Sequence, residues 1–195
     1  MIHQLIGVGL FLVGCLHIIK PIQDNEVQIV KALQELFNRK PWLSLFREIW
    51  FFGRTSFTLI VIILLICIDW KTGLIADLVF FIIVGIEQLI KQLFHRVRPF
   101  SVHTSIAMLQ PLEPHDSSFP SGDALRVWYI ALILPMAAGN SIPFLIGTIT
   151  LALFVSLGRI VLGVHYLTDT LAGIGLGLLG AGTTIWLWHF FNLLY

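Results

Sequence analysis

Three short clusters of ionisable and hydroxyl residues lie in a chain that is otherwise strongly apolar. In the first cluster, KQLFHRVRP, Lys91 and Arg98 are seven residues apart and Pro99 follows directly. Seven residues make about two helical turns, so both cations can lie on one face at the end of a helix. Two cations held in this way are suited to binding the oxygens of a tetrahedral anion such as phosphate.

The second cluster, PSGD, stands at the start of an apolar run that begins at Asp123. Ser121 is of the residue type that caps a helix N-terminus, and Gly122 would lie in the first turn, where backbone amides have no partner within the helix. Those amides and the positive end of the helix dipole make such a turn an anion site. Asp123 at this position is expected either to handle protons or to hold a charged group.

The third cluster, GRIVLGVHYLTD, holds Arg159, His165 and Asp169. His165 and Asp169 are four residues apart and therefore share a helix face. An aspartate that holds one ring nitrogen fixes the tautomer of a histidine and leaves the other nitrogen free to attack. A histidine oriented in this way beside a phosphate site is a candidate nucleophile. The expected intermediate is a phosphohistidine that water later releases.

The surrounding sequence is that of an integral membrane protein. Of the 195 residues 57% are hydrophobic and 12% are charged, whereas soluble proteins average about a quarter charged residues. The net charge of +1 gives no reason to expect a nucleic-acid partner. Since a spanning helix needs about 20 mostly apolar residues, we predict an all-α bundle of six transmembrane helices in a single domain, residues 1–195. The six apolar stretches run roughly over residues 2–19, 55–70, 74–94, 123–138, 142–162 and 167–188.

Residues 24–50, between the first two stretches, differ in pattern. In NEVQIVKALQELF the apolar residues recur at steps of three and four, which predicts an amphipathic helix. This helix either lies in the membrane surface, where Trp42 and Trp50 suit the interfacial belt, or packs over the end of the bundle. Packing over the bundle is the plainer interpretation. The glycines of GIGLGLLGAG in the last stretch favour close helix packing within the chain, with dimerisation through that face as an alternative.

Counting the spans alternately places all three clusters on one side of the bilayer. The end of the third span, the start of the fourth, the end of the fifth and the start of the sixth then lie at one face. We therefore predict that seven residues converge around a phosphate group: Lys91, Arg98, Ser121, Asp123, Arg159, His165 and Asp169. The loop of residues 100–120 is long enough to be functional and carries His103, His115 and Asp116.

Together the three clusters resemble those of the type 2 phosphatidic acid phosphatase family, whose pattern is Lys-x6-Arg-Pro, Pro-Ser-Gly-His and Ser-Arg-x5-His-x3-Asp. This chain has K-QLFHRV-RP, PSGD and GR-IVLGV-H-YLT-D at the same spacings, and the resemblance covers roughly residues 74–188. It implies hydrolysis of a phosphate ester or anhydride without a metal ion or cofactor. His165 would attack phosphorus and Asp169 would orient it. The oxygens would be bound by the cationic and capping residues Lys91, Arg98, Arg159, Ser121 and Gly122.

Two positions depart from the family pattern. Gly158 stands where the family has a serine, which removes one possible hydroxyl contact. Asp123 stands where the family has the histidine that is taken to protonate the leaving oxygen. Burial and a dianionic substrate favour a protonated Asp123 that acts as this acid, and this is the role we favour.

Nearby cations and the helix N-terminus favour instead an ionised Asp123 that orients Arg126 or a catalytic cation. In that case His115, His103 or water would protonate the leaving group. A leaving group that needs little help, such as the phosphate of a diphosphate lipid, is a further possibility.

The substrate is expected to be a membrane lipid, because a site at the rim of the bundle faces the head groups of the bilayer. Polyprenyl diphosphate, phosphatidate, phosphatidylglycerophosphate and the 1-phosphate of lipid A all fit, and the sequence does not separate them. The alternatives are a phosphotransferase with the same site and a lipid-phosphate binding or transport protein without turnover. The oligomeric state is left open.

Two signals disagree about the side of the membrane. Residues 20–54 carry six Lys and Arg on the side of the site, and the positive-inside rule then places the site in the cytoplasm. The family resemblance implies instead a bacterial inner membrane protein with its site on the periplasmic or exoplasmic side. We follow the resemblance, because a basic segment can also bind anionic lipids.

Overall fold

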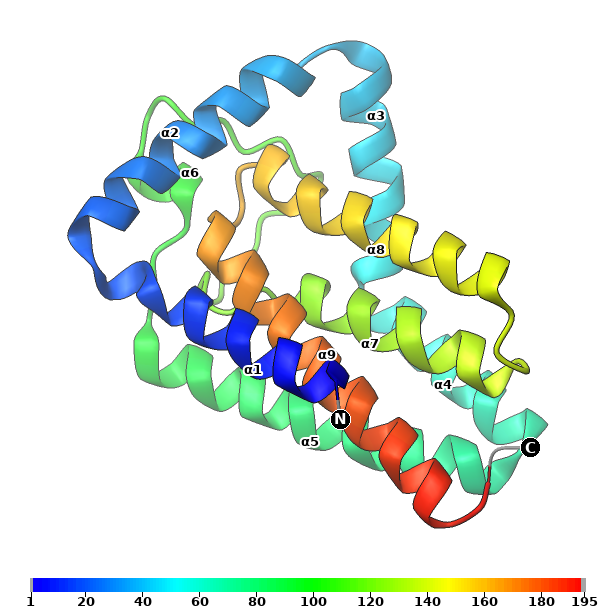
Figure 1. The fold of residues 1–195 in the computed structure, drawn as a ribbon. Coiled ribbons are helices and arrows are strands. Elements are labelled where there is room, and N and C mark those ends of the chain that lie inside the picture. Colours follow the sequence, from blue (N-terminus) through cyan, green and yellow to red (C-terminus); the bar gives the residue numbers. More distant parts are fainter. Residues whose placement is uncertain (1, 194–195) are drawn as a thin grey trace.

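The computed structural model describes residues 2–193, and these residues form helices and connecting turns with no strand among them (Figure 1). The helices are α1 (Ile2–Gly14), α2 (Lys20–Phe37), α3 (Lys40–Ile49), α4 (Thr55–Ile68), α5 (Trp70–Phe94), α6 (Pro99–Val102), α7 (Gly122–Ala137), α8 (Ile142–Val161) and α9 (Leu167–Phe190). Short 3-10 turns, Cys15–Ile18 and Trp50–Gly53, follow α1 and α3. The all-α part of the prediction is confirmed.

Helix α9 lies at the centre of the bundle, with α1, α5 and α7 packed along it (Figure 1). Glycines allow the closest of these approaches. A Cβ added at Gly173 would lie 2.2 Å from the carbonyl oxygen of Ser121, and one at Gly175 would lie 2.6 Å from the carbonyl oxygen of Gly7 in α1. The glycine-rich run is therefore covered by other helices of the same chain, as the close-packing interpretation predicts.

The main apolar core lies between α4, α5, α7 and α9 and includes the fully buried side chains of Tyr129, Ile133 and Trp188. On the outside of the bundle, large apolar side chains such as Ile63 and Phe81 are more than half exposed. Such an apolar exterior suits contact with lipid acyl chains.

Three segments among the described residues are long and apolar enough to cross a membrane: Trp70–Val102, which contains α5, and helices α8 and α9. The count rises to five if α1 with α2, bent by 102°, and α3 with α4, bent by 47°, each form one span. Helix α7 has 16 residues, which is short for a span of about 20. The number of six spans therefore stays a prediction.

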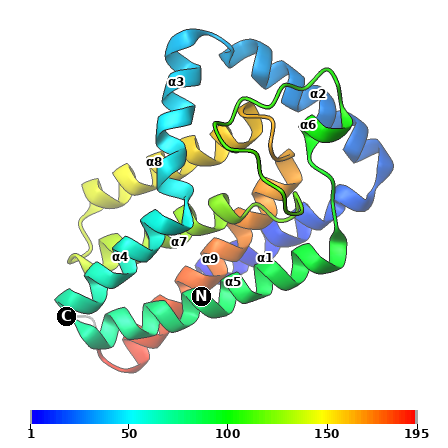
Figure 2. The same cartoon turned by 180° about the vertical axis from the view of Figure 1, so that it is seen from behind.

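The segment between the first two apolar stretches forms α2 and α3, which lie across the end of the bundle where the three clusters meet (Figures 1 and 2). Val30 of α2 is fully buried against Ile160 of α8 and Tyr166. Phe46 of α3 is fully buried against Val161. This is the packing that the covering interpretation predicts, while a location in the membrane surface stays a prediction.

Local backbone chemistry sets the ends of the helices that carry the clusters. Ser121 caps α7, because its Oγ accepts a hydrogen bond from the amide of Ala124 at 3.5 Å. The turn from α8 to α9 depends on Gly163, which has a φ of +76° and where a Cβ would lie 2.3 Å from the carbonyl oxygen of Ala107. This turn carries His165 back over the end of the bundle.

Candidate active site

The three clusters meet at a cavity of about 230 Å³, here called the cationic pocket. Its lining includes four cations and one imidazole: Lys91, Arg98, Arg126, Arg159 and His165. The remaining lining residues are Trp50, Gln110, Leu112, Glu113, Pro114, Asp116, Gly122 and Asp123. A larger cavity of about 650 Å³ lies at the other end of α7, between Asp69, Leu134 and His189, and contains none of the cluster residues.

Five of the seven residues predicted to converge line the cationic pocket directly: Lys91, Arg98, Asp123, Arg159 and His165. They come from α5, the segment after it, α7, α8 and the turn before α9, as the alternating order of helices requires. Their proximity is confirmed, and their chemical roles stay predictions.

Ser121 and Asp169 lie behind the pocket wall, each with 0% of its side chain exposed. The hydroxyl of Ser121 is used in capping α7, whereas Gly122 does line the pocket. The structure therefore gives Ser121 a place in positioning the helix and does not bring its hydroxyl to the phosphate-binding surface that the sequence predicted.

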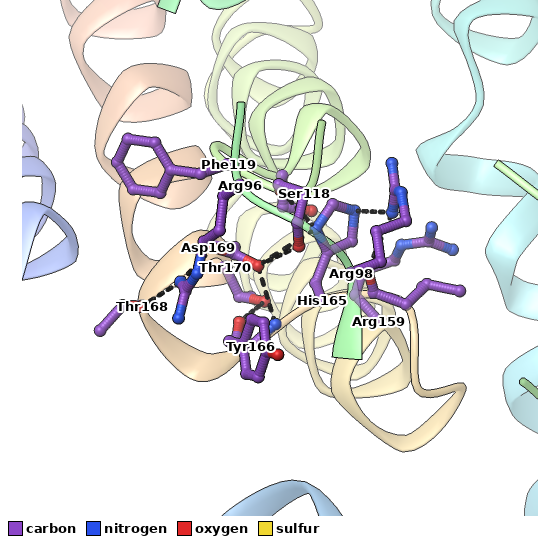
Figure 3. A network of polar contacts seen from close by, with 12 residues as sticks. Arg96, Arg98, Ser118, Phe119, Arg159, His165, Tyr166, Thr168, Asp169 and Thr170 are labelled. Carbon is purple, nitrogen blue, oxygen red and sulfur yellow. Dashed lines mark hydrogen bonds and ion pairs between the residues drawn. The ribbon is translucent and has the colours of Figure 1, made fainter. Parts of the chain in front are cut away.

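The imidazole of His165 is held between two partners of opposite kind (Figure 3). Its Nδ1 lies 2.8 Å from the carbonyl oxygen of Ser118, and its Nε2 lies 3.3 Å from Nη1 of Arg98. A carbonyl can only accept a hydrogen bond and a guanidinium can only donate one, so Nδ1 carries the proton and Nε2 carries the lone pair. This lone pair is on the nitrogen that faces the cations.

The expected direct hydrogen bond from His165 to Asp169 is replaced by the one to Ser118. Oδ2 of Asp169 lies 3.7 Å from Nδ1 of His165, which is too far for a hydrogen bond. This oxygen accepts hydrogen bonds instead from the Ser118 hydroxyl and, at 2.8 Å, from the Tyr166 amide. Asp169 therefore acts on the imidazole through its nearby charge and through Ser118, whose carbonyl sets the tautomer.

His165 has 2% of its surface exposed, and this burial together with the charge of Arg98 lowers its pKa to about 3. The group lies in the turn between α8 and α9. The imidazole is therefore neutral over the physiological pH range, which is the state that a nucleophile requires.

Behind Asp169 lies a buried ion-pair network that connects α2 to the third cluster. Arg96 pairs with Asp169 and donates to Oγ1 of Thr168 at 2.8 Å (Figure 3). Its other nitrogen lies 2.7 Å from Glu26, which is 2% exposed and also accepts the backbone amide of Thr168 at 2.7 Å.

Sequence reasoning missed this network, because it assigned no role to Arg96 or Glu26. A signal was present in the pattern, since Glu26 is four residues before Val30 and so shares the buried face of α2. A carboxylate on an apolar helix face requires a partner, and Arg96 is that partner.

Asp123 is enclosed by donors on both of its oxygens. Nη2 of Arg126 lies 2.6 Å from Oδ1, and Oδ2 lies 3.0 Å from Nη2 of Arg159 and accepts the indole N–H of Trp50 at 3.0 Å. Two guanidinium groups and an indole stabilise the carboxylate and leave no oxygen free to hold a proton. The favoured proton-handling role is therefore not supported by this geometry, which matches the alternative of an anion that orients Arg126 and a catalytic cation.

Arg159 is 3% exposed, and two nitrogens of its guanidinium group have no hydrogen-bond acceptor among the described residues. Beyond its contact with Asp123, no group among residues 2–193 accepts a hydrogen bond from its Nε or Nη1. Buried donors nearly always have partners in folded proteins, and these two N–H groups belong to a residue that lines the cationic pocket, so they are available to an anion bound there. Gly158, the residue before it, faces Phe46, where a Cβ would lie 3.0 Å from the ring. The serine of the family pattern is thus replaced by close packing of α3.

The remaining two cations are bridged by a carboxylate of the loop. Asp116 pairs with Lys91 through Oδ2 and with Arg98 through Oδ1 at 2.6 Å. Although partial burial favours its neutral form, the two cations hold the pKa of Asp116 far below the ordinary value. Lys91 also contacts Glu87 at 2.9 Å, so it is placed by α5 as well as by the loop.

The two loop histidines that could have supplied a proton lie outside the cationic pocket. His103 stands against the ring of Tyr166, with ring centroids 6.5 Å apart. His115 is exposed. Neither of them lines the pocket.

Residues 72–193 match the family model described as the PAP2 superfamily, which is more than half of the chain. The chain belongs to the PAP2 superfamily. A relative from Mycobacterium tuberculosis, the decaprenylphosphoryl-5-phosphoribose phosphatase, is 32% identical over 158 residues, which are 78% of this chain and 85% of that protein. The undecaprenyl-diphosphatase of Sulfolobus acidocaldarius is 33% identical over 107 residues, which are 55% of this chain and 50% of that protein.

The crystal structure of a transmembrane PAP2-type phosphatidylglycerolphosphate phosphatase from Bacillus subtilis shares the fold with a TM-score of 0.79. It covers 96% of both chains at 24% identity. The PAP2 assignment explains the spacing of the three clusters, and the chain is an integral membrane phosphatase of this family. Asp123 lines the cationic pocket of this chain.

Proposed function

We propose that this chain hydrolyses a phosphate monoester or a diphosphate on a membrane lipid, without a metal ion, through a phosphohistidine formed on His165. One combination of features in the cationic pocket carries the proposal. His165 presents a nitrogen lone pair, and Arg159 presents buried N–H groups for which the described residues offer no acceptor. A nucleophile in one pocket with unfilled anion donors is suited to phosphoryl transfer.

Substrate binding would place the terminal phosphoryl group between Lys91, Arg98 and Arg159. The carboxylate of Asp116 has to leave Lys91 and Arg98 first, and its 48% exposed side chain on a loop can do so. The backbone at Gly122, at the N-terminus of α7, adds the positive end of a helix dipole. When Arg98 turns to the phosphoryl oxygens, it releases Nε2 of His165.

In the chemical step, Nε2 of His165 forms a bond to phosphorus as the P–O bond to the lipid breaks, and the lipid oxygen leaves with the electron pair and takes any proton that it needs from water. Nδ1 keeps its proton and its hydrogen bond to Ser118. The positive charge that develops on the ring is stabilised by Asp169, whose oxygen is 3.7 Å away. Water then attacks the phosphohistidine, the P–N bond breaks, and the electron pair returns to Nε2. Phosphate leaves and the neutral imidazole is restored.

A lipid substrate is supported by the position of the pocket and by the relatives. The cationic pocket lies at one end of a bundle whose outside is apolar, so a lipid can stay in the bilayer while its head group enters. The two relatives by sequence described above are named for isoprenoid lipid phosphates, and a further relative, from Bacillus subtilis, is named for phosphatidylglycerophosphate. We further propose six spans, a bacterial inner membrane location and a pocket on the periplasmic side, as the family resemblance implies.

The test is phosphate release by the purified chain from a panel of lipids in detergent micelles. The panel holds a polyprenyl diphosphate, phosphatidate, phosphatidylglycerophosphate and lipid A 1-phosphate. We expect release from at least one of them, inhibition by vanadate, and complete loss in His165→Ala. The control is His189→Ala, an exposed histidine at the opposite end of α9, which should retain activity.

The alternatives predict different products. A phosphotransferase would place the phosphoryl group on a second lipid and release little free phosphate. A binding or transport protein would hold the lipid phosphate without breaking it. Either result, or unchanged hydrolysis in His165→Ala, contradicts the proposed function.

A further inference from the structure

We propose that the ionised Asp123 makes this enzyme selective for phosphoanhydrides, that is for lipid diphosphates over lipid monophosphates, because its pocket lacks a group that can protonate a leaving oxygen. The inference rests on the proposed function and narrows its substrate class. Relatives in the family are named for both kinds of substrate, so family membership alone does not choose between them.

The first observation is the state of Asp123. Both of its oxygens face donors that keep their protons. Oδ1 accepts from Arg126 at 2.6 Å, and Oδ2 accepts from the indole of Trp50 at 3.0 Å and forms an ion pair with Arg159 at 3.0 Å. A proton on either oxygen would face one of these donors and break its contact. At the start of α7 the chain therefore presents a fixed anion where a proton donor would be useful.

The second observation is that the other lining groups do not replace the missing acid. The guanidinium groups of Arg98, Arg126 and Arg159 keep their protons at all physiological pH values. Lys91 contacts the carboxylate of Glu87 at 2.9 Å, one turn earlier in α5, and this contact remains when Asp116 leaves the pocket. Its ammonium group is therefore placed to bind the phosphoryl oxygens beside a fixed carboxylate.

The carboxylates and the imidazole of the pocket are also excluded. Asp116 has to leave Lys91 and Arg98 before the phosphoryl group binds, and Glu113 is exposed to solvent, so neither carboxyl group is held against the leaving oxygen. The proton of His165 is on Nδ1, directed at Ser118 and away from the pocket. No residue lining the cationic pocket among residues 2–193 is therefore set up to donate a proton to a departing oxygen.

The lack of a proton donor affects lipid monophosphates and lipid diphosphates differently. When Nε2 of His165 attacks a monophosphate, the P–O bond to the lipid breaks and an alkoxide leaves, which is strongly basic and needs a proton. When it attacks the terminal phosphorus of a diphosphate, the bond to the bridging oxygen breaks and the electron pair stays on a lipid monophosphate. That anion is stable without a proton. When water later attacks the phosphohistidine, its oxygen bonds to phosphorus, the P–N bond breaks, and the protons of the water go to the phosphate and to solvent.

The size of the effect follows from the usual contribution of a positioned acid, which is about 10²- to 10⁴-fold in rate. We therefore expect kcat/KM for farnesyl diphosphate to exceed that for farnesyl monophosphate by about 10²-fold or more, with the same tail in the same micelles. A series of aryl phosphates of decreasing leaving-group acidity, from p-nitrophenyl to phenyl phosphate, should show a steep fall in kcat/KM.

Two variants at one position separate proton donation from charge. Asp123→His restores a side chain that can donate a proton, and we expect it to narrow the gap between the two farnesyl substrates by about tenfold or more and to flatten the aryl series. Asp123→Asn removes the same charge without supplying an acid. The ratio of its kcat/KM for farnesyl diphosphate to that for farnesyl monophosphate should therefore be as large as in the natural chain, whatever its overall activity.

The outcomes distinguish the two levels of the proposal. Similar rates on both farnesyl substrates, or a flat aryl series in the natural chain, overturn the selectivity and leave the proposed function standing if His165→Ala abolishes release. Release from none of the substrates overturns both. If Asp123→His does not fold, as judged by its elution and thermal melting, the aryl series of the natural chain decides alone.

Discussion

Replacing Asp116 by Asn should strengthen anion binding in the cationic pocket. In the structure the Asp116 carboxylate contacts Lys91 and Arg98, the two cations that the proposed mechanism assigns to the phosphoryl group. A substrate phosphate must therefore displace an anion that belongs to the chain. Asn keeps the size and some hydrogen bonding of the side chain but removes the negative charge, so this competition is weakened.

The magnitude can be worked out from the two contacts. Lys91 and Arg98 are nearly buried, while Asp116 is 48% exposed, so each ion pair is largely screened by solvent and is worth about 0.5–1 kcal/mol. The two together give about 1–2 kcal/mol, which corresponds to about a 5- to 30-fold change in affinity. The backbone carbonyl of Asp116 still accepts Nε of Arg98 at 3.0 Å, so the position of Arg98 is kept.

The assay is inhibition by vanadate, with phosphate release from a lipid substrate as the readout. The inhibition constant of Asp116→Asn should be lower than that of the natural chain by about this factor, and the difference should shrink at high salt. The matched control is Glu48→Gln, which removes one negative charge from an exposed position on α3. Unchanged or weaker vanadate binding in Asp116→Asn would show that the carboxylate does not compete with the substrate.

Three other perturbations address separate parts of the molecule. Glu26→Gln removes the buried charge that faces Arg96, and it should lower the free energy of unfolding by about 1–3 kcal/mol and reduce kcat, as thermal melting in detergent and phosphate release would show. Gly163→Val should lower the free energy of unfolding by about 2 kcal/mol or more, because residue 163 has a φ of +76° and the new Cβ would lie 2.3 Å from a carbonyl oxygen. Gly147→Val is the control, because a Cβ at residue 147 has open space around it, and its melting temperature should be near that of the natural chain. The pKa of His165 is lowered to about 3 in the folded chain, so as the pH falls the unfolded chain binds a proton at this residue before the folded chain does. The stability that the neutral imidazole contributes is therefore fully present above pH ~6.5 and is lost as the pH falls toward 3. The melting temperature should therefore fall more steeply over this range than in His165→Asn, and equal slopes would contradict the assigned neutral state.

The sequence was sufficient to predict the helices and the convergence of the clusters, because both depend on short-range patterns. Apolar runs of helix-spanning length mark the long helices, and alternation of direction then places Lys91, Arg98, Arg159 and His165 at one end. Boundaries were less accurate where polar residues act as caps. Helix α5 begins at Trp70 and not at residue 74, because the Asp69 side chain caps it by accepting from the amides of residues 71 and 72.

The partners of the candidate site residues could not be predicted, because each pair is far apart in the chain. Trp50 and Asp123 are 73 residues apart, and Trp50 was expected in an interfacial belt. Glu26 and Thr168 are 142 residues apart. No local periodicity specifies such pairs, and they decide the ionised state of Asp123 and the position of the turn that carries His165.

The central claim is that His165 carries the phosphoryl group, and the most direct measurement is to find it there. The chain would be mixed with its lipid substrate, quenched in alkali within one turnover, digested and analysed by mass spectrometry. Alkali preserves a phosphoramidate, and we expect phosphate on His165 in the natural chain and none in His165→Ala. Lipid turnover without phosphate on His165, or with phosphate on a different residue, would contradict the proposed mechanism.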